Sequence, residues 1–122
     1  MRFTWKIRKR LLYYYKRELV LYRIHLQSCH YQQAWLHLER AHIIGQAYPL
    51  QHTYAHWLML KFGFRMKDTR EILGQLPRLL VGGVKSFVGK IPKGNTGGAN
   101  VPPLRVMPLP KDIEDLFSMG GV

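Results

Sequence analysis

The stretch LERAHIIGQAYPLQHTYAHWLML, residues 38–60, decides the fold of this 122-residue chain. Its apolar residues recur every three to four positions on both sides of Pro49, which is the spacing of two amphipathic helices joined by a short turn. Gly45 is typical of a helix end, and Pro49 follows because proline cannot continue a helix. The stretch therefore predicts a helical hairpin, with helices over about 31–46 and 50–65.

Helical periodicity continues on both sides of this hairpin. Residues 3–28 carry apolar side chains on one helical face and basic side chains on the opposite face. Asp68 is a favourable N-cap for a further helix, which runs to about residue 87 with a kink or a restart at Pro77. Because the connections are short, we expect the second, third and fourth helices to be antiparallel neighbours.

The composition changes at Gly89. Glycine and proline dominate from there and no helical period survives, which predicts an extended arm before a short helix in KDIEDLF, residues 111–117. The chain length suits one domain. We therefore predict a single all-α domain over 1–122, with a compact bundle of about four helices over 1–88 and a Gly/Pro-rich C-terminal arm over 89–122.

Composition narrows the possible functions. The chain has 19 Lys and Arg against 7 Asp and Glu, and this net charge of +12 attracts nucleic acid, anionic lipid or an acidic protein surface. The basic first helix is the expected contact for such partners. Cys29 is the single cysteine, so an intrachain disulfide is excluded. No apolar run approaches the roughly 20 residues of a membrane span and the start lacks the apolar core of a secretory signal, so we expect a cytoplasmic protein.

Four side chains of the hairpin are candidate metal ligands. Glu39 and His42 are spaced i, i+3, so both lie on one helical face. This Glu-x-x-His unit points a carboxylate and an imidazole at the metal in di-metal helical bundles. His52 and His56 are spaced i, i+4, one turn apart, where two nitrogens can chelate one ion. The short turn allows the two pairs to face each other.

Residues of the first and fourth helices could complete this site. Glu71 is a further candidate ligand, and Gln75, Arg78 and Glu18 are candidates for supporting the ligands from behind. Imidazole and carboxylate together suit zinc, iron, manganese, nickel or copper better than calcium. Two alternatives remain open: a hydrogen-bonded polar core without an ion, and an organic or haem-type ligand.

Three other features bear on function. The glycine-rich GNTGGAN, residues 94–100, is expected to be a turn that closes over the bundle. His30 and His37 are expected to point outward. No catalytic triad is recognisable in the sequence. Cys29 and His30 are not a nucleophile–base pair either, because adjacent residues on a helix point about 100° apart. Enzymatic activity is therefore not the expected function.

The competing class of function is a non-catalytic interaction module with a basic surface for an acidic partner. The hairpin over 31–65 is close in length to a tetratricopeptide-type unit. A single unit without stacked copies makes a poor solenoid, because each repeat buries its apolar face against a neighbour. We therefore favour metal handling or sensing.

Four motifs of the chain occur in one combination: LERAHIIGQ (38–46), HTYAHWLML (52–60), KDTREILGQLPR (67–78) and GNTGGANV (94–101). Together they resemble a small bacterial family known only as a domain of unknown function, number 3703. The resemblance covers about 31–117, without the basic start. It implies that the polar residues of these motifs belong to a recurrent set, which is consistent with a metal-related role. It implies no mechanism, because the family has no established activity.

Overall fold

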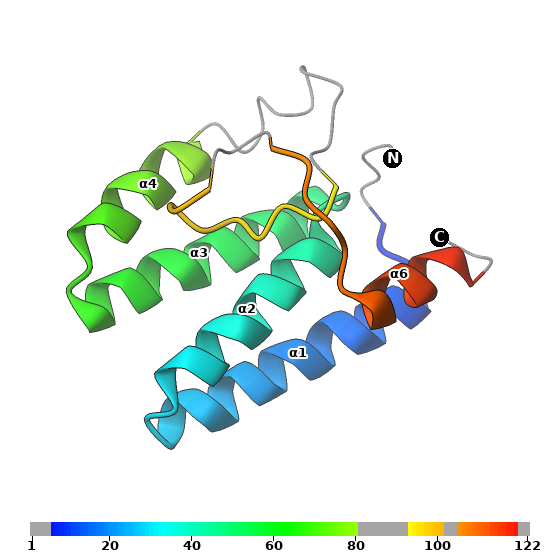
Figure 1. Cartoon of the computed structure of the whole chain (residues 1–122), viewed down its shortest axis with the longest axis horizontal. Coiled ribbons are helices and arrows are strands. Elements are labelled where there is room, and N and C mark those ends of the chain that lie inside the picture. Colours follow the sequence, from blue (N-terminus) through cyan, green and yellow to red (C-terminus); the bar gives the residue numbers. More distant parts are fainter. Residues whose placement is uncertain (1–5, 81–92, 102–104, 120–122) are drawn as a thin grey trace.

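The computed structural model describes residues 6–80, 93–101 and 105–119. These residues form helices and no strand, so the predicted all-α class is confirmed. The described helices are α1 (Lys9–Gln27), α2 (Tyr31–Gly45), α3 (Pro49–Met66), α4 (Thr69–Leu80) and α6 (Lys111–Ser118) (Figure 1). Residues 6–8 precede α1, so the first helix begins later than predicted. The predicted continuation of the fourth helix to residue 87 lies outside the described residues.

The helices α1 and α2 form an antiparallel pair that contains much of the core (Figure 1). Ala34 and Ala41 of α2 are completely buried, and their small side chains allow the two helices to approach closely. The larger apolar side chains fill the space around them. These are Leu11, Tyr15, Leu19 and Tyr22 of α1 and Leu38, Ile43 and Ile44 of α2.

The turn between α2 and α3 is tight because of Gly45. A Cβ atom at this position would come within 2.9 Å of both the Tyr15 ring and Gln51. Pro49 follows as the first residue of α3, where its missing N–H needs no helical partner. This turn places the end of α2 directly against the start of α3, and both segments carry histidines.

The turn between α3 and α4 has ordinary capping chemistry. Lys67 adopts a left-handed conformation with φ of 53°, and the Asp68 carboxylate then accepts a hydrogen bond of 3.1 Å from the Glu71 backbone N–H. The helix α4 runs through Pro77 to Leu80 without the restart that the sequence predicted. As a consequence, Arg78 keeps its helical register with Glu71 and points into the protein.

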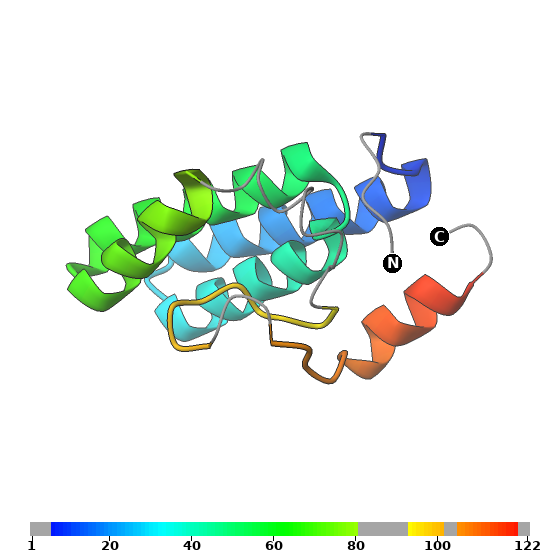
Figure 2. The same cartoon turned by 90° about the horizontal axis from the view of Figure 1, so that it is seen from above.

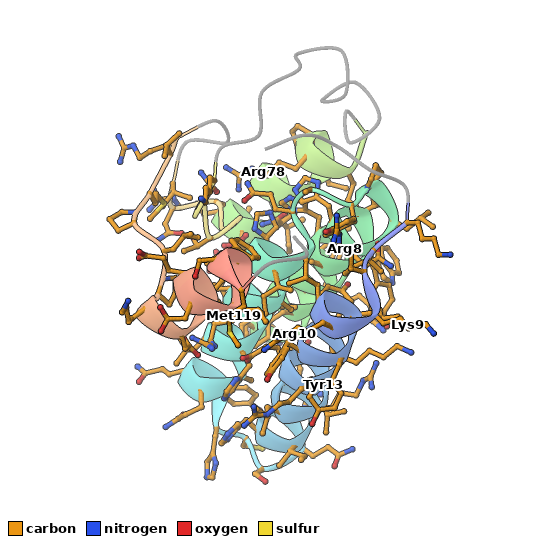
Figure 3. The ribbon with its side chains drawn as sticks, turned by 90° about the vertical axis from the view of Figure 1, so that its right-hand side faces the viewer. Arg8, Lys9, Arg10, Tyr13, Arg78 and Met119 are labelled. Atoms are coloured by element: carbon orange, nitrogen blue, oxygen red, sulfur yellow. The ribbon has the colours of Figure 1, made fainter. Side chains whose placement is uncertain are left out.

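Two segments without helix or strand follow in the described part of the chain. Residues 93–101, called the glycine loop below, cross from the end of α2 to α4, and residues 105–110 lead to α6 (Figures 1 and 2). Ile113 and Leu116 of α6 are buried in the core. Near the start of α1, the Arg10 guanidinium contacts the sulfur of Met119, which directly follows α6, at 3.4 Å (Figure 3).

Candidate metal centre

Three imidazole rings meet where α2 turns into α3. His42 Nε2 lies 3.1 Å from His56 Nε2 and 3.0 Å from His52 Nε2, and the last two nitrogens are 3.0 Å apart. All three residues are at most 2% exposed. Among the described residues, they are the group of three or more metal-ligating side chains whose ligand atoms converge.

The three nitrogens form a nearly equilateral triangle. The rings are tilted against one another by 55–77°, so their edges rather than their faces meet at this triangle. The three Nε2 atoms would hold the ion if a transition metal binds here, and imidazole nitrogens are common ligands of such ions.

The tautomer of His42 follows from its backbone partner. His42 Nδ1 lies 2.9 Å from the Asn95 carbonyl oxygen, which can only accept a hydrogen bond. Nδ1 must therefore carry a proton. In a neutral imidazole, Nε2 then has no proton and presents a lone pair to the other two histidines.

The tautomer of His56 follows from a chain of two side chains in α4. His56 Nδ1 lies 2.6 Å from Oε1 of Gln75. The Gln75 amide nitrogen donates to the Glu71 carboxylate at 2.6 Å and to the Gly97 carbonyl at 2.8 Å, and both of these groups only accept. The orientation of the amide is therefore fixed, and His56 Nδ1 is the donor to its oxygen. Nε2 of the neutral ring again presents a lone pair.

With these two assignments, Nε2 of His42 and Nε2 of His56 face each other at 3.1 Å in the protein interior, and Nε2 of His52 lies 3.0 Å from both. Neutral imidazole nitrogens that converge in this way are a common ligand set for transition-metal ions. The three histidines could therefore hold one metal ion.

The glycine loop covers the histidines from outside. A Cβ atom on Gly97, which has φ of +87°, would lie 2.6–2.7 Å from three atoms of the His42 ring. Gly94, with φ of +82°, approaches the Met107 carbonyl in the same way. Asn95 is 1% exposed, and its side chain closes the turn by accepting from Gly97 N–H at 2.9 Å and donating to the Arg105 carbonyl at 2.8 Å. The loop backbone therefore lies directly on the His42 ring.

Side chains of α4 hold this loop in place. The Arg78 guanidinium donates to the carbonyls of Gly97 at 3.0 Å and Val101 at 2.7 Å. Burial lowers the pKa of Arg78, and the negative charge of Glu71 opposes this shift. The Glu71 carboxylate accepts the Ala99 N–H at 3.0 and 3.1 Å. The predicted supporting residues Gln75 and Arg78 thus connect α4 to His56 and to the loop.

The carboxylates predicted as ligands occupy different positions. Both oxygens of Glu71 contact the loop, one of them also contacts Gln75, and they do not belong to the converging group. Glu39 is half-buried on α2, where burial raises the pKa of its carboxyl group; hydrogen bonding with Trp35 and Thr96 opposes this shift, and the charge of Glu71 adds to it. The structure therefore brings together the three histidines of the predicted ligand set without the two carboxylates.

Glu18 is part of a separate network between α1 and α2. Its carboxylate accepts hydrogen bonds from His37 Nδ1 at 2.7 Å and from Arg40 Nε at 2.8 Å. His37 is consequently half-buried, although its position on the helical wheel predicted that it points outward. A supporting role of Glu18 toward the metal ligands stays a prediction.

The sequence patterns missed the backbone groups of the site. The Asn95 and Gly97 carbonyls and the Ala99 N–H are essential partners of His42, Gln75 and Glu71. Backbone atoms have no residue type to recognise. The run GNTGGAN was the available signal, because two of its glycines have the positive φ that a close backbone approach requires.

This fold and this cluster define a class: a small, all-helical protein whose hairpin buries a triangle of histidines under a glycine-rich loop. The chain belongs to the family described as protein of unknown function (DUF3703), which it matches over residues 9–117. The predicted family membership is therefore confirmed, and the match extends into α1, which the sequence motifs did not cover. The chain has no significant match among curated proteins or solved structures. None of the described helices combines the length and the apolar character needed to cross a lipid bilayer.

Proposed function

We propose that the protein binds one transition-metal ion through the Nε2 atoms of His42, His52 and His56, and that it handles or senses this ion. One observation carries the proposal: the Nε2 atoms of three buried histidines converge to within 3.0–3.1 Å of one another, and the Nδ1 atoms of His42 and His56 each have a hydrogen-bond partner that orients the ring. Metal-binding histidines commonly have this second hydrogen bond, which fixes the ring and makes the ligand nitrogen more basic.

The donor set defines the class of ion. Three neutral imidazoles suit zinc, copper, nickel and iron better than calcium or magnesium, which prefer oxygen. The negative charge nearest to the triangle along its hydrogen bonds is that of Glu71, which reaches His56 through Gln75. Direct ligation by Glu71 or Glu39 stays a prediction, and for Glu71 it would require breaking its contacts with Ala99 and Gln75.

Binding fits this site better than catalysis. The three histidines are buried and the glycine loop lies on the His42 ring, so a substrate would first have to displace the loop. An ion needs only a brief opening of the loop. We therefore propose a cytoplasmic handling or sensing protein in which loop opening controls loading and release.

Elemental analysis tests this function. The untagged protein, purified and dialysed against a weak chelator, is expected to retain close to one equivalent of metal, and His42→Ala/His56→Ala is expected to retain none. Thr53→Ala is the control, because Thr53 is exposed on the same helix. A conservative His52→Gln variant covers the case in which the double variant does not fold. Metal-free parent protein that stays fully folded with a strong chelator and takes up no added zinc would overturn the proposal.

An interaction module remains the second candidate, and one observation favours it. An open, largely apolar groove lies between α1 and α3, and Lys16 and Arg23 add positive charge to its lining. Leu50 and Val20 in this groove are 64% and 49% exposed. An acidic partner with apolar side chains would match this surface. Loss of partner binding in Lys16→Glu/Arg23→Glu, with metal content unchanged, would support this second function.

A further inference from the structure

We propose a second metal site, accessible to solvent, at the turn between α1 and α2. Its ligands are Nδ1 of His25 and Nδ1 of His30, which lie 3.4 Å apart. This site shares no residue with the buried triangle, so it neither requires nor follows from the function proposed above. Its ligand class is a divalent first-row ion such as Zn²⁺, Ni²⁺ or Cu²⁺, all of which accept imidazole.

The backbone of the turn fixes the spacing of the two histidines. The His30 N–H donates to the His25 carbonyl at 2.8 Å, and the Cys29 N–H donates to the Leu26 carbonyl at 3.1 Å. Cys29 has a φ of 59°, in the left-handed region where a helix usually ends on glycine. The turn therefore closes around one strained, non-glycine residue and brings residues i and i+5 side by side.

The ring of His25 is positioned from its other side. His37 stacks on it with a centroid distance of 5.3 Å and an angle of 6° between the rings. His37 is itself held by the Glu18 carboxylate, which Arg40 also contacts. His37, Glu18 and Arg40 are positioning residues: they keep the His25 ring in one orientation without contacting the proposed ion.

The distance between the nitrogens matches the bite of a tetrahedral ion. With metal–nitrogen bonds of about 2.0–2.1 Å and a tetrahedral angle, two ligand nitrogens are separated by about 3.3–3.4 Å. The nitrogens of His25 and His30 already stand at this distance, so binding needs little rearrangement. Without an ion, Nδ1–H of one ring donates a hydrogen bond to Nδ1 of the other; when the ion binds both Nδ1 atoms, the donor ring carries its proton on Nε2 instead, and both rings stay neutral.

The two proposed sites differ in exposure. His30 and Cys29 are exposed and His25 is partly exposed, so water can complete the coordination and the ion can exchange freely. His42, in contrast, is buried. His30 precedes His42 by twelve residues, which corresponds to about 18 Å along a helix. We therefore infer a weak site that collects ions at the surface near one end of α2, while the buried triangle lies near the other end.

The test is a Zn²⁺ titration of the full-length protein, followed through the NMR signals of the His25 and His30 rings. These signals are expected to shift together and to reach saturation, with a fitted stoichiometry of one ion for the two rings. His30→Ala is expected to lower the affinity at least about tenfold, because even the loss of a supporting group typically has an effect of this size. Gln27→Ala, exposed on the same turn, is the control and should bind as the parent does.

Three results would overturn the proposal. The first is that the His25 and His30 signals do not change with added Zn²⁺. The second is that His30→Ala binds at this turn as tightly as the parent. The third is that binding is lost in Cys29→Ser but kept in His30→Ala, which would assign the ion to the thiol. The NMR signals report on the His25 and His30 rings alone. The result therefore does not depend on whether the buried histidines bind an ion.

Discussion

His56 Nδ1 lies 2.6 Å from Oε1 of Gln75, and this hydrogen bond determines which nitrogen His56 directs at the other two histidines. The bond depends in turn on Glu71 and Gly97, which hold the amide nitrogen of Gln75 and thereby turn its oxygen toward the ring. The tautomer of His56, and with it the nitrogen that would bind the proposed ion, is therefore set one helix away, in α4.

The variant Gln75→Met is expected to weaken metal binding about 10–100-fold, which is the usual effect of losing the second partner of a ligating histidine. Methionine fills a similar volume but offers no amide oxygen to His56 Nδ1. A competitive chelator titration measures the affinity. Gln32→Met, on the exposed face of α2, should leave it unchanged. Equal affinities of Gln75→Met and the parent would show that the α4 hydrogen bond does not prepare the ligand.

The variant Gly97→Ala is expected to destabilise the loop over the site. Alanine at φ of +87° costs at least about 1 kcal/mol, and its methyl group would press on the His42 ring at 2.6 Å. We expect a lower melting temperature and faster metal loss to a chelator. Gly98→Ala is the matched control, because its nearest neighbour is the end of the Asn100 side chain, which can move. Similar effects of both substitutions would contradict the special role of Gly97.

The variant Arg78→Met is expected to loosen the glycine loop. It removes the donors to the Gly97 and Val101 carbonyls, and unsatisfied buried groups cost about 1–3 kcal/mol each. Hydrogen exchange of the Ala99 amide, which bonds to Glu71, should become faster. Arg70→Met, exposed on the same helix, is the control. Unchanged exchange at Ala99 would mean that Glu71 alone secures the loop.

The contact between α6 and α2 is expected to depend on pH. Hydrogen bonding to the Arg40 guanidinium lowers the pKa of Asp112, so this contact stabilises the fold above the pKa of a free aspartate, about 3.9, and is lost as the pH falls through the lower folded value. Asp112 is 65% exposed, so Asp112→Asn should cost at most about 1 kcal/mol at pH 7.

Urea unfolding at pH 7 and near pH 2 measures this effect. The difference in unfolding free energy between the parent and Asp112→Asn should shrink at the lower pH, because the parent carboxylate is then protonated. Asp115→Asn is the control, since Asp115 pairs with Lys111 of the same helix and does not join two helices. If the difference in unfolding free energy were the same at both pH values, the charge of Asp112 would not contribute to stability.

The histidine triangle could be predicted from the sequence to the extent that it depends on helical register. His52 and His56 are one turn apart on α3, and His42 lies on the buried face of α2, so a short turn suffices to bring them together. Register does not determine the direction of a long side chain at a helix edge. Glu39 lies next to the predicted cluster in sequence, but its carboxylate does not belong to the group that converges with the three imidazoles.

Helical periodicity could not predict contacts between residues that are far apart in the sequence. The Asn95 carbonyl that fixes the His42 tautomer comes 53 residues later in the chain, from a segment without regular structure. The pairing of Glu18 with His37 and Arg40 depends on how α1 crosses α2, which a helical wheel of one helix does not contain. The fold class therefore followed from local pattern, whereas the hydrogen bonds that prepare the site required the tertiary structure.

The 53 residues between His42 and Asn95 also set an order of events during synthesis. A ribosome that adds about 5–20 residues per second makes His56, the last of the three histidines, roughly 2–8 s before Asn95. The nascent chain thus carries its three imidazoles before their cover exists. An ion of the proposed class could therefore reach the nascent chain without any opening motion, whereas the proposed exchange in the finished protein requires one.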